Sequence, residues 1–122
     1  MGNESEVVAV VAKMEPQNSS VDFHIEILMR ISRKTVMTIA NVVFDGKPLC
    51  YLNDRQISYE RQSIGGREDL KASDVMFYFT TDQVKFAEVS DNSLISFDVY
   101  LKDENNRDIL DRRVTDHKVN KL

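Results

Sequence analysis

Asp22, His24 and Glu26 alternate along the segment 21–31, and their types and spacing suit them to chemistry. Side chains at positions i and i+2 of a strand share a face, so the imidazole would lie beside two carboxylates. A histidine among carboxylates can move a proton or help to bind a metal. The spacing therefore suggests a small enzyme as one alternative. The competing interpretation, which we favour, is an ordinary histidine on a charged sheet face.

The other reactive residues lack the partners that catalysis or zinc binding requires. His117 is far from His24 in sequence, and Cys50 is the single cysteine, so no zinc-ligand spacing exists. Cys50 has no glycine elbow or nearby base and is expected to be a small buried hydrophobe. Gly65-Gly66 lacks the lysine and hydroxyl of a phosphate loop and indicates a turn. We expect no cofactor and no resident metal.

Acidic residues in the expected turns are the feature most suited to calcium. Asp103, Glu104 and Asp108 form one group, and Asp45 with Asp54 forms another. If the two groups met at one end of a sandwich, they would offer oxygen ligands. The ligand spacing of an EF-hand loop is absent, so calcium binding is not expected. A calcium-dependent surface-binding domain is nevertheless kept as an alternative.

Composition and charge limit the class of partner. The chain has 122 residues, of which 42% are hydrophobic and 30% charged, as in a soluble globular domain. A net charge of −4 without a basic stripe argues against nucleic acid. No run approaches the roughly 20 apolar residues of a membrane helix, so membrane insertion is not expected.

The start of the chain bears on location. Residues 1–6 are acidic and lack the basic start of a secretory signal. The expected location is cytoplasmic if the chain is complete, and extracellular or at the cell surface if a signal has been removed. A single cysteine excludes an internal disulfide, which fits a reducing compartment.

The segment 21–31 has the clearest structural pattern in the chain. Every odd position is apolar, whereas the even positions are polar except for Leu28. This period of two predicts a long antiparallel strand with one buried face and one solvent-exposed face. The segment 94–101 alternates in the same way, so Ile25, Ile27, Phe97 and Val99 are expected in the core.

The composition of other segments predicts short strands separated by turns. Further strands are expected over residues 7–12, 35–44, 49–61 (irregular), 75–79 and 109–115. Asp45-Gly46 predicts a tight turn in which Gly46 takes a positive φ. Residues 83–89 are either a strand or a turn or two of helix, and residues 1–6 and 117–122 are expected to be flexible.

Seven or eight short strands at this spacing predict a single all-β domain over residues 1–122. An antiparallel β-sandwich, immunoglobulin-like in outline, is favoured over a barrel. The absence of a strand–helix–strand rhythm makes a parallel sheet improbable.

These observations favour a non-catalytic interaction or structural module. The first strand carries no internal charge or proline, so its edge needs a cover or a partner. Val7, Val8, Val10 and Val11 are the candidate interaction edge. The expected partner is another protein or a second copy of this chain.

Overall fold

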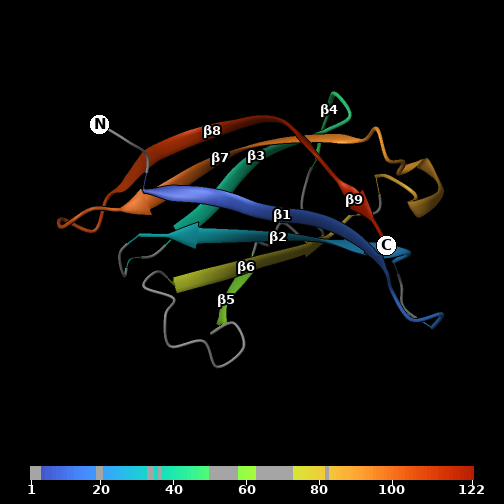
Figure 1. Ribbon diagram of the computed structural model, residues 1–122, viewed down its shortest axis with the longest axis horizontal. Helices are drawn as coiled ribbons and strands as arrows, with labels where there is room; N and C mark the ends of the chain where they lie inside the picture. The colour runs from blue at the N-terminus through green and yellow to red at the C-terminus, as the bar shows by residue number, and fades with distance from the viewer. Residues whose placement is uncertain are drawn as a thin grey trace.

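Two β-sheets pack face to face in a β-sandwich, which Figure 1 shows with the five-stranded sheet toward the viewer. The computed structural model describes residues 4–18, 21–32, 35, 37–49, 58–62, 73–81 and 83–122. Within these residues nine strands form, of which β4 and β9 have only 2 residues each. The predicted all-β sandwich is confirmed, whereas its immunoglobulin-like outline stays a prediction.

The five-stranded sheet is built around β2, which pairs with β1 on one side and β6 on the other. Its order is β5-β6-β2-β1-β9. Strand β9 runs parallel to β1, whereas the other pairs are antiparallel. The strands are β1 (Ser5–Met14), β2 (Phe23–Ile31), β5 (Ser58–Gln62), β6 (Ser73–Thr80) and β9 (Asn120–Lys121).

The four-stranded sheet has the order β4-β3-β7-β8 and is antiparallel throughout. A two-residue turn joins β3 to β4, and both of its residues have positive φ: 48° at Asp45 and 78° at Gly46. This geometry suits the twist of a hairpin and confirms the predicted turn. The strands are β3 (Met37–Phe44), β4 (Lys47–Pro48), β7 (Leu94–Lys102) and β8 (Asp108–Lys118).

The core lies between the two sheets and is supplied by alternate residues of each strand. Every odd position of β2 from Phe23 to Ile31 is at most 1% exposed, as the pattern predicted. On the facing sheet, Ile95, Phe97 and Val99 of β7 have no exposed surface. The four residues predicted to be buried are therefore confirmed, and the two best-patterned strands face each other across the core.

The connection from β6 to β7 contains one short helical turn. Of the two alternatives for residues 83–89, the helical one is confirmed, because η2 (Phe86–Glu88) is a 3-10 helix. The ring of Phe86 lies 5.6 Å from that of Phe23, and the Lys121 ammonium lies 4.5 Å above it. Among the described residues, no helix has the length and apolar character needed to cross a membrane.

The two ends of the described chain belong to strands. In the segment 117–122, β8 continues to Lys118 and β9 follows it across to the other sheet. The expected flexibility of this segment and of residues 1–6 stays a prediction. Val119 at the crossing is fully buried, and the backbone N–H of Leu122 donates to the carbonyl of Ala12 at 3.0 Å. At the other end β1 already begins at Ser5, while residues 1–3 lie outside the described part.

Truncating Phe97 to alanine should destabilise the domain by roughly 3–5 kcal/mol, because the removed ring leaves a cavity in the centre of the core. The matched control is Leu94→Ala in the same strand, where the side chain is 38% exposed. Urea denaturation of both variants measures the difference. Equal stability of the two variants would show that the face assignment of β7 is wrong.

Candidate functional site

A cluster of charged side chains surrounds His24 on the outer face of the five-stranded sheet. Its Nδ1 lies 2.8 Å from a carboxylate oxygen of Glu15, and its Nε2 lies 3.2 Å from one of Glu26. The ammonium of Lys13, which is opposite His24 in the β1–β2 register, lies 3.2 Å from the other Glu26 oxygen. The cluster therefore links the ends of β1 and β2.

Only part of the predicted group is brought together here. Glu26 contacts His24 as expected, but Asp22 does not, because its carboxylate accepts a hydrogen bond from the backbone of Phe86 at 3.3 Å. Its place beside the imidazole is taken by Glu15. That residue is nine positions away in sequence and could not be identified from the spacing within one strand.

The hydrogen bonding of His24 indicates a structural role. Both ring nitrogens face carboxylates of the same chain, and the ring is only 14% exposed. A protonated imidazole donates to both carboxylates, whereas a neutral one has a single N–H. Contacts of both ring nitrogens with carboxylates of neighbouring strand ends are typical of a charged cluster that supports the sheet.

The surroundings of Glu26 shift the pKa of its carboxyl group. Partial burial raises the pKa of its carboxyl, but the hydrogen bonds from His24 and Lys13 and their positive charges lower it by more. The net pKa lies below the ordinary glutamate value. The folded protein therefore favours the ionised form of Glu26.

The acidic turns do not converge, contrary to the condition for a calcium site. Asp45 bonds to the backbone of Leu94 at the start of β7, whereas Asp103 follows the end of that strand. Nine strand residues separate the two groups by roughly 25–30 Å. Asp54 lies outside the described residues, among which no group of metal-ligating side chains is found.

The carboxylates of the β7–β8 turn are engaged by the fold itself. Asp103 accepts hydrogen bonds from the backbone N–H groups of Asn105 and Arg107 at 2.9 and 2.8 Å. Asp108 pairs with the Lys102 ammonium at 3.1 Å. The acidic residues of this turn therefore stabilise the connection between β7 and β8.

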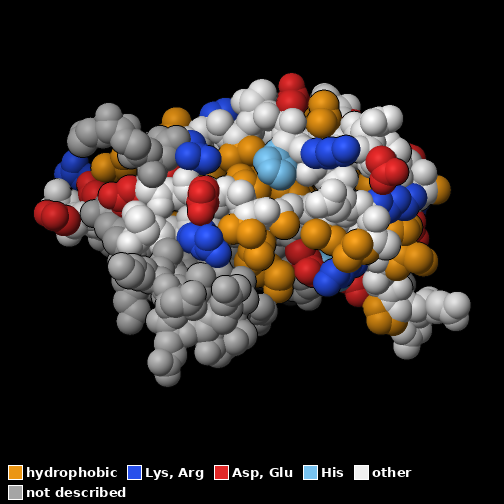
Figure 2. Space-filling model, viewed as in Figure 1, with side chains coloured by type: hydrophobic (Ala, Val, Ile, Leu, Met, Phe, Trp, Pro, Cys, Tyr) orange, Lys and Arg blue, Asp and Glu red, His pale blue; other side chains and the backbone are white. Residues whose placement is uncertain are grey.

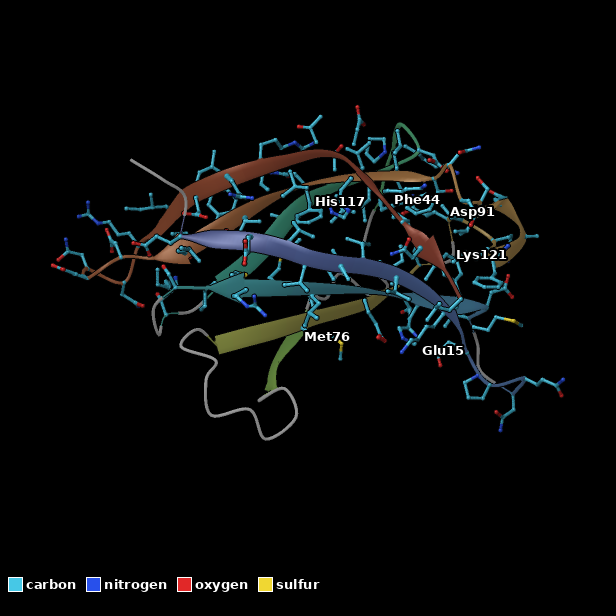
Figure 3. All side chains as sticks on the ribbon, viewed as in Figure 1. Glu15, Phe44, Met76, Asp91, His117 and Lys121 are labelled. Carbon is cyan, nitrogen blue, oxygen red and sulfur yellow. The ribbon has the colours of Figure 1, made fainter. Side chains whose placement is uncertain are left out.

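A groove of about 360 Å³ runs between β1 of one sheet and β8 of the other. Figure 3 places the side chain of His117 between these two strands, and Figure 2 shows a histidine side chain at the surface with basic side chains on either side. The lining residues come from both strands: Glu6 and Val7 from β1, and Arg112, Arg113, Val114 and His117 from β8.

The groove is closed at both ends. At one end the Asp111 carboxylate accepts hydrogen bonds from the backbone N–H groups of Glu4 and Ser5 at 3.0 and 3.1 Å, and from the Ser5 hydroxyl. At the other end the chain crosses from β8 to β9, which pairs with Val11 and Ala12. Between these ties, the edges of β1 and β8 face the groove without a strand partner among the described residues.

The hydrogen-bond register identifies which backbone groups of β8 face this opening. The carbonyl of Leu94 accepts from Asp45, so the even-numbered residues of β7 direct their backbone groups to β3. Asp98 is one of them, and its partner on β8 is Arg113. The backbone N–H and C=O of Arg113, and of Thr115 two residues later, therefore point away from β7 toward the open edge.

The four valines of the predicted edge have different environments. Val7 lines the groove, and Val8 is 42% exposed at an irregularity in the β1–β2 register. Val10 is fully buried in the core, and Val11 is paired with Asn120 of β9. The accessible edge of β1 is therefore limited to the few residues between the hydrogen bonds to Asp111 at Ser5 and the pairing with β9 at Val11.

Strand β8 is the longer open edge, and sequence reasoning did not single it out. Its segment 108–118 contains seven charged or titratable residues, which resembles a solvated strand rather than a binding edge. Its position at the margin of a sheet depends on sheet order, which the strand's own pattern does not contain. Cys50 and Gly65-Gly66 lie outside the described residues.

Searches against protein-family models, curated proteins and solved structures found no match. The functional interpretation therefore depends on the geometry of the His24 cluster and of the groove.

Replacing Glu26 with glutamine should lower stability at neutral pH by roughly 1 kcal/mol, because two charged hydrogen bonds lose their charge. Since the folded pKa of Glu26 is depressed, its contribution is present above the unfolded pKa and is lost as pH falls through the folded value. Stability of the variant should therefore depend less on pH in the acid range. Thermal melts across that range, with the exposed Glu88→Gln as control, measure this effect.

Calcium in the millimolar range should leave the melting temperature unchanged, because Asp45 and Asp103 are far apart and bond to backbone N–H groups. A melting screen with calcium and with magnesium provides the measurement. A rise of several degrees that Asp103→Asn abolishes would contradict this expectation.

Proposed function

We propose that this protein is a non-catalytic interaction module that binds an extended segment of another protein chain in the groove between β1 and β8. The observation that carries the proposal is the open side of the sandwich, where two strand edges lie on either side of a groove of about 360 Å³. No second class of function has comparable support, since both nitrogens of His24 contact carboxylates of the same chain.

The chemistry of the groove suits an extended backbone. The outward N–H and C=O groups of Arg113 and Thr115 can pair with an added strand, as in recognition by β-augmentation. Val7 and Val114 supply an apolar surface for a side chain of that strand. Backbone pairing would provide affinity, and the side chains of the lining would provide selectivity.

Association with a second copy is a special case of the same proposal. Substitution of Val10 by lysine would not test this self-association, because Val10 is fully buried and a charge there would unfold the domain. Thr115 is the better position. Its side chain is exposed and its N–H points away from β7, so this residue can be changed at the edge alone.

Thr115→Pro should abolish capture of extended peptides, because proline removes an edge N–H and places its ring where a strand would pair. The measurement is selection from a random peptide library displayed on phage, followed by titration of the selected peptides. Thr115→Ala, which keeps the N–H, is the matched control and should bind as the wild type does. The fold should survive both changes, since proline is tolerated where the N–H faces away from the sheet.

A library that yields no binder, or binders that Thr115→Pro does not affect, would overturn the β8 edge as the site. Sedimentation equilibrium of the same proteins tests self-association. A wild-type dimer that Thr115→Pro converts to a folded monomer identifies the partner as a second copy. A wild type that stays monomeric at high concentration removes that version and leaves a foreign chain.

A further inference from the structure

We infer that His117 selects the bound segment: its Nε2 accepts a hydrogen bond from a hydroxyl group of that segment, two residues from an apolar side chain that packs on Val114. This inference rests on the proposed function and specifies the chemistry of its partner.

An extra residue in β8 brings His117 to the core-facing side of this strand. Val114 is opposite Phe97. His117 is opposite Ile95, so three positions along β8 match two along β7. The irregular residue is Asp116, whose φ is 50°. Residues directly opposite on antiparallel strands share a face, so Val114 and His117 both lie on the face on which β7 buries its side chains.

A β-bulge of this kind re-aims a side chain. In a regular strand, positions 114 and 117 would fall on opposite faces, since only alternate residues share a face. His117 would then point to the other face of the sheet, whereas the structure places it in the groove lining with Val7 and Val114. The backbone N–H of Asp116 donates to the Ser96 hydroxyl at 2.9 Å, which holds the bulge in place.

The ring of His117 has one hydrogen bond among the described residues, and its Nδ1 makes it. This nitrogen lies 2.8 Å from the carbonyl oxygen of Lys118. A carbonyl oxygen only accepts, so Nδ1 carries the proton and donates. In a neutral imidazole the other nitrogen then has no proton and is an acceptor. The fold therefore fixes the tautomer and leaves Nε2 as an acceptor on a residue of the groove lining.

The other charged side chains of the lining are engaged within the chain. Glu6 pairs with a basic residue of β2 at 3.7 Å. The guanidinium of Arg113 lies 3.3 Å from the Asp98 carboxylate. Arg112 is opposite Val99 and so faces inward, and it also has an interaction within the chain. The imidazole Nε2, by contrast, keeps its lone pair for an incoming segment.

An acceptor of this kind favours a segment that supplies a donor. His117 is half-buried, so an added strand would displace water from Nε2. An apolar side chain there would leave the lone pair unsatisfied, which costs free energy. A carboxylate has no proton to donate and would face the lone pair directly. A hydroxyl group donates to Nε2 and satisfies it.

Threonine suits both the hydrogen bond and the backbone pairing. Its β-branched side chain is enriched in strands, whereas asparagine, which also donates, is depleted there. Lysine can donate as well, but its charge would lie in a groove that Arg112 and Arg113 already line. The expected recognition element is therefore a threonine two residues from an apolar side chain in an extended segment.

The test uses three synthetic peptides of equal length with identical outward-facing residues. The inward-facing residues of the first are threonine, valine and threonine. The second has valine in place of both threonines, which removes the hydroxyl groups with little change of shape. The third has O-methylserine there, which keeps an oxygen acceptor but has no proton to donate. The symmetric design does not depend on the direction of the added strand.

Fluorescence anisotropy of the labelled peptides measures their affinities for the full chain at about pH 8, where histidine side chains are generally neutral. We expect the threonine probe to bind roughly fivefold more tightly than the other two. His117→Phe keeps a ring but has no acceptor, so this advantage should disappear. His117→Gln places a carboxamide oxygen near the position of Nε2 and should retain it.

Lys118→Gln is the matched control, because it changes an exposed neighbour whose side chain is outside the groove lining. It should leave the threonine advantage unchanged. Circular dichroism confirms that each variant is folded.

Equal binding of the three probes to the wild type would overturn the inference, and so would a threonine advantage that survives His117→Phe. An O-methylserine probe as tight as the threonine probe would show that Nε2 is not the acceptor. Complete loss of the advantage in His117→Gln would also count against an acceptor at this position.

The proposed function fails separately, through a peptide library that yields no binder. If no probe binds, the sequences of the library binders decide. Binders that Thr115→Pro blocks but that have no hydroxyl side chain two residues from an apolar one would sustain the groove as a binding site and reject the role of His117.

Discussion

Burial of one face of β2 against the opposite sheet is the constraint from which the remaining structure follows. Each apolar side chain on that face is almost completely removed from water, and β2 is also paired along both edges. A one-residue slip of its register would expose that face and bury the charges of His24 and Glu26. The hydrophobic effect therefore sets the position of β2, and its neighbours β1 and β6 take their registers from it.

On the side of the sandwich near β1 and β8, the two sheets are joined by polar contacts rather than by a continuous strand pair. Asp111 joins the two sheets at one end through the backbone of Glu4 and Ser5, and the β8–β9 crossing joins them at the other. The first connection consists of hydrogen bonds, and the second is a strand pairing of only two residues. The middle of this side is left as a groove with an inward-facing arginine. An inward-facing charge at a sheet edge discourages indiscriminate pairing with other strands.

On the solvent-exposed face of the five-stranded sheet, the spacing of Asp22, His24 and Glu26 produces a network of contacts within the chain. His24 is held between Glu15 and Glu26, and Lys13 neutralises part of their charge. This network pairs the polar groups of β1 and β2 with one another. The groove has the opposite character, because its polar backbone groups have no strand partner within the described chain.

The sequence by itself determined the local elements of this protein. A period of two in β2 and β7 predicted two strands and their buried faces, and Asp45-Gly46 predicted a hairpin turn, because side-chain alternation and positive φ are local properties. Pairs distant in sequence were decided only by the tertiary structure. The pairing of residues 120–121 with β1, the contact of Glu15 with His24 and the position of β8 at a sheet edge are examples. Each depends on sheet order and on the crossing between sheets, which result from burying all apolar faces together and leave no periodic signal in any one segment.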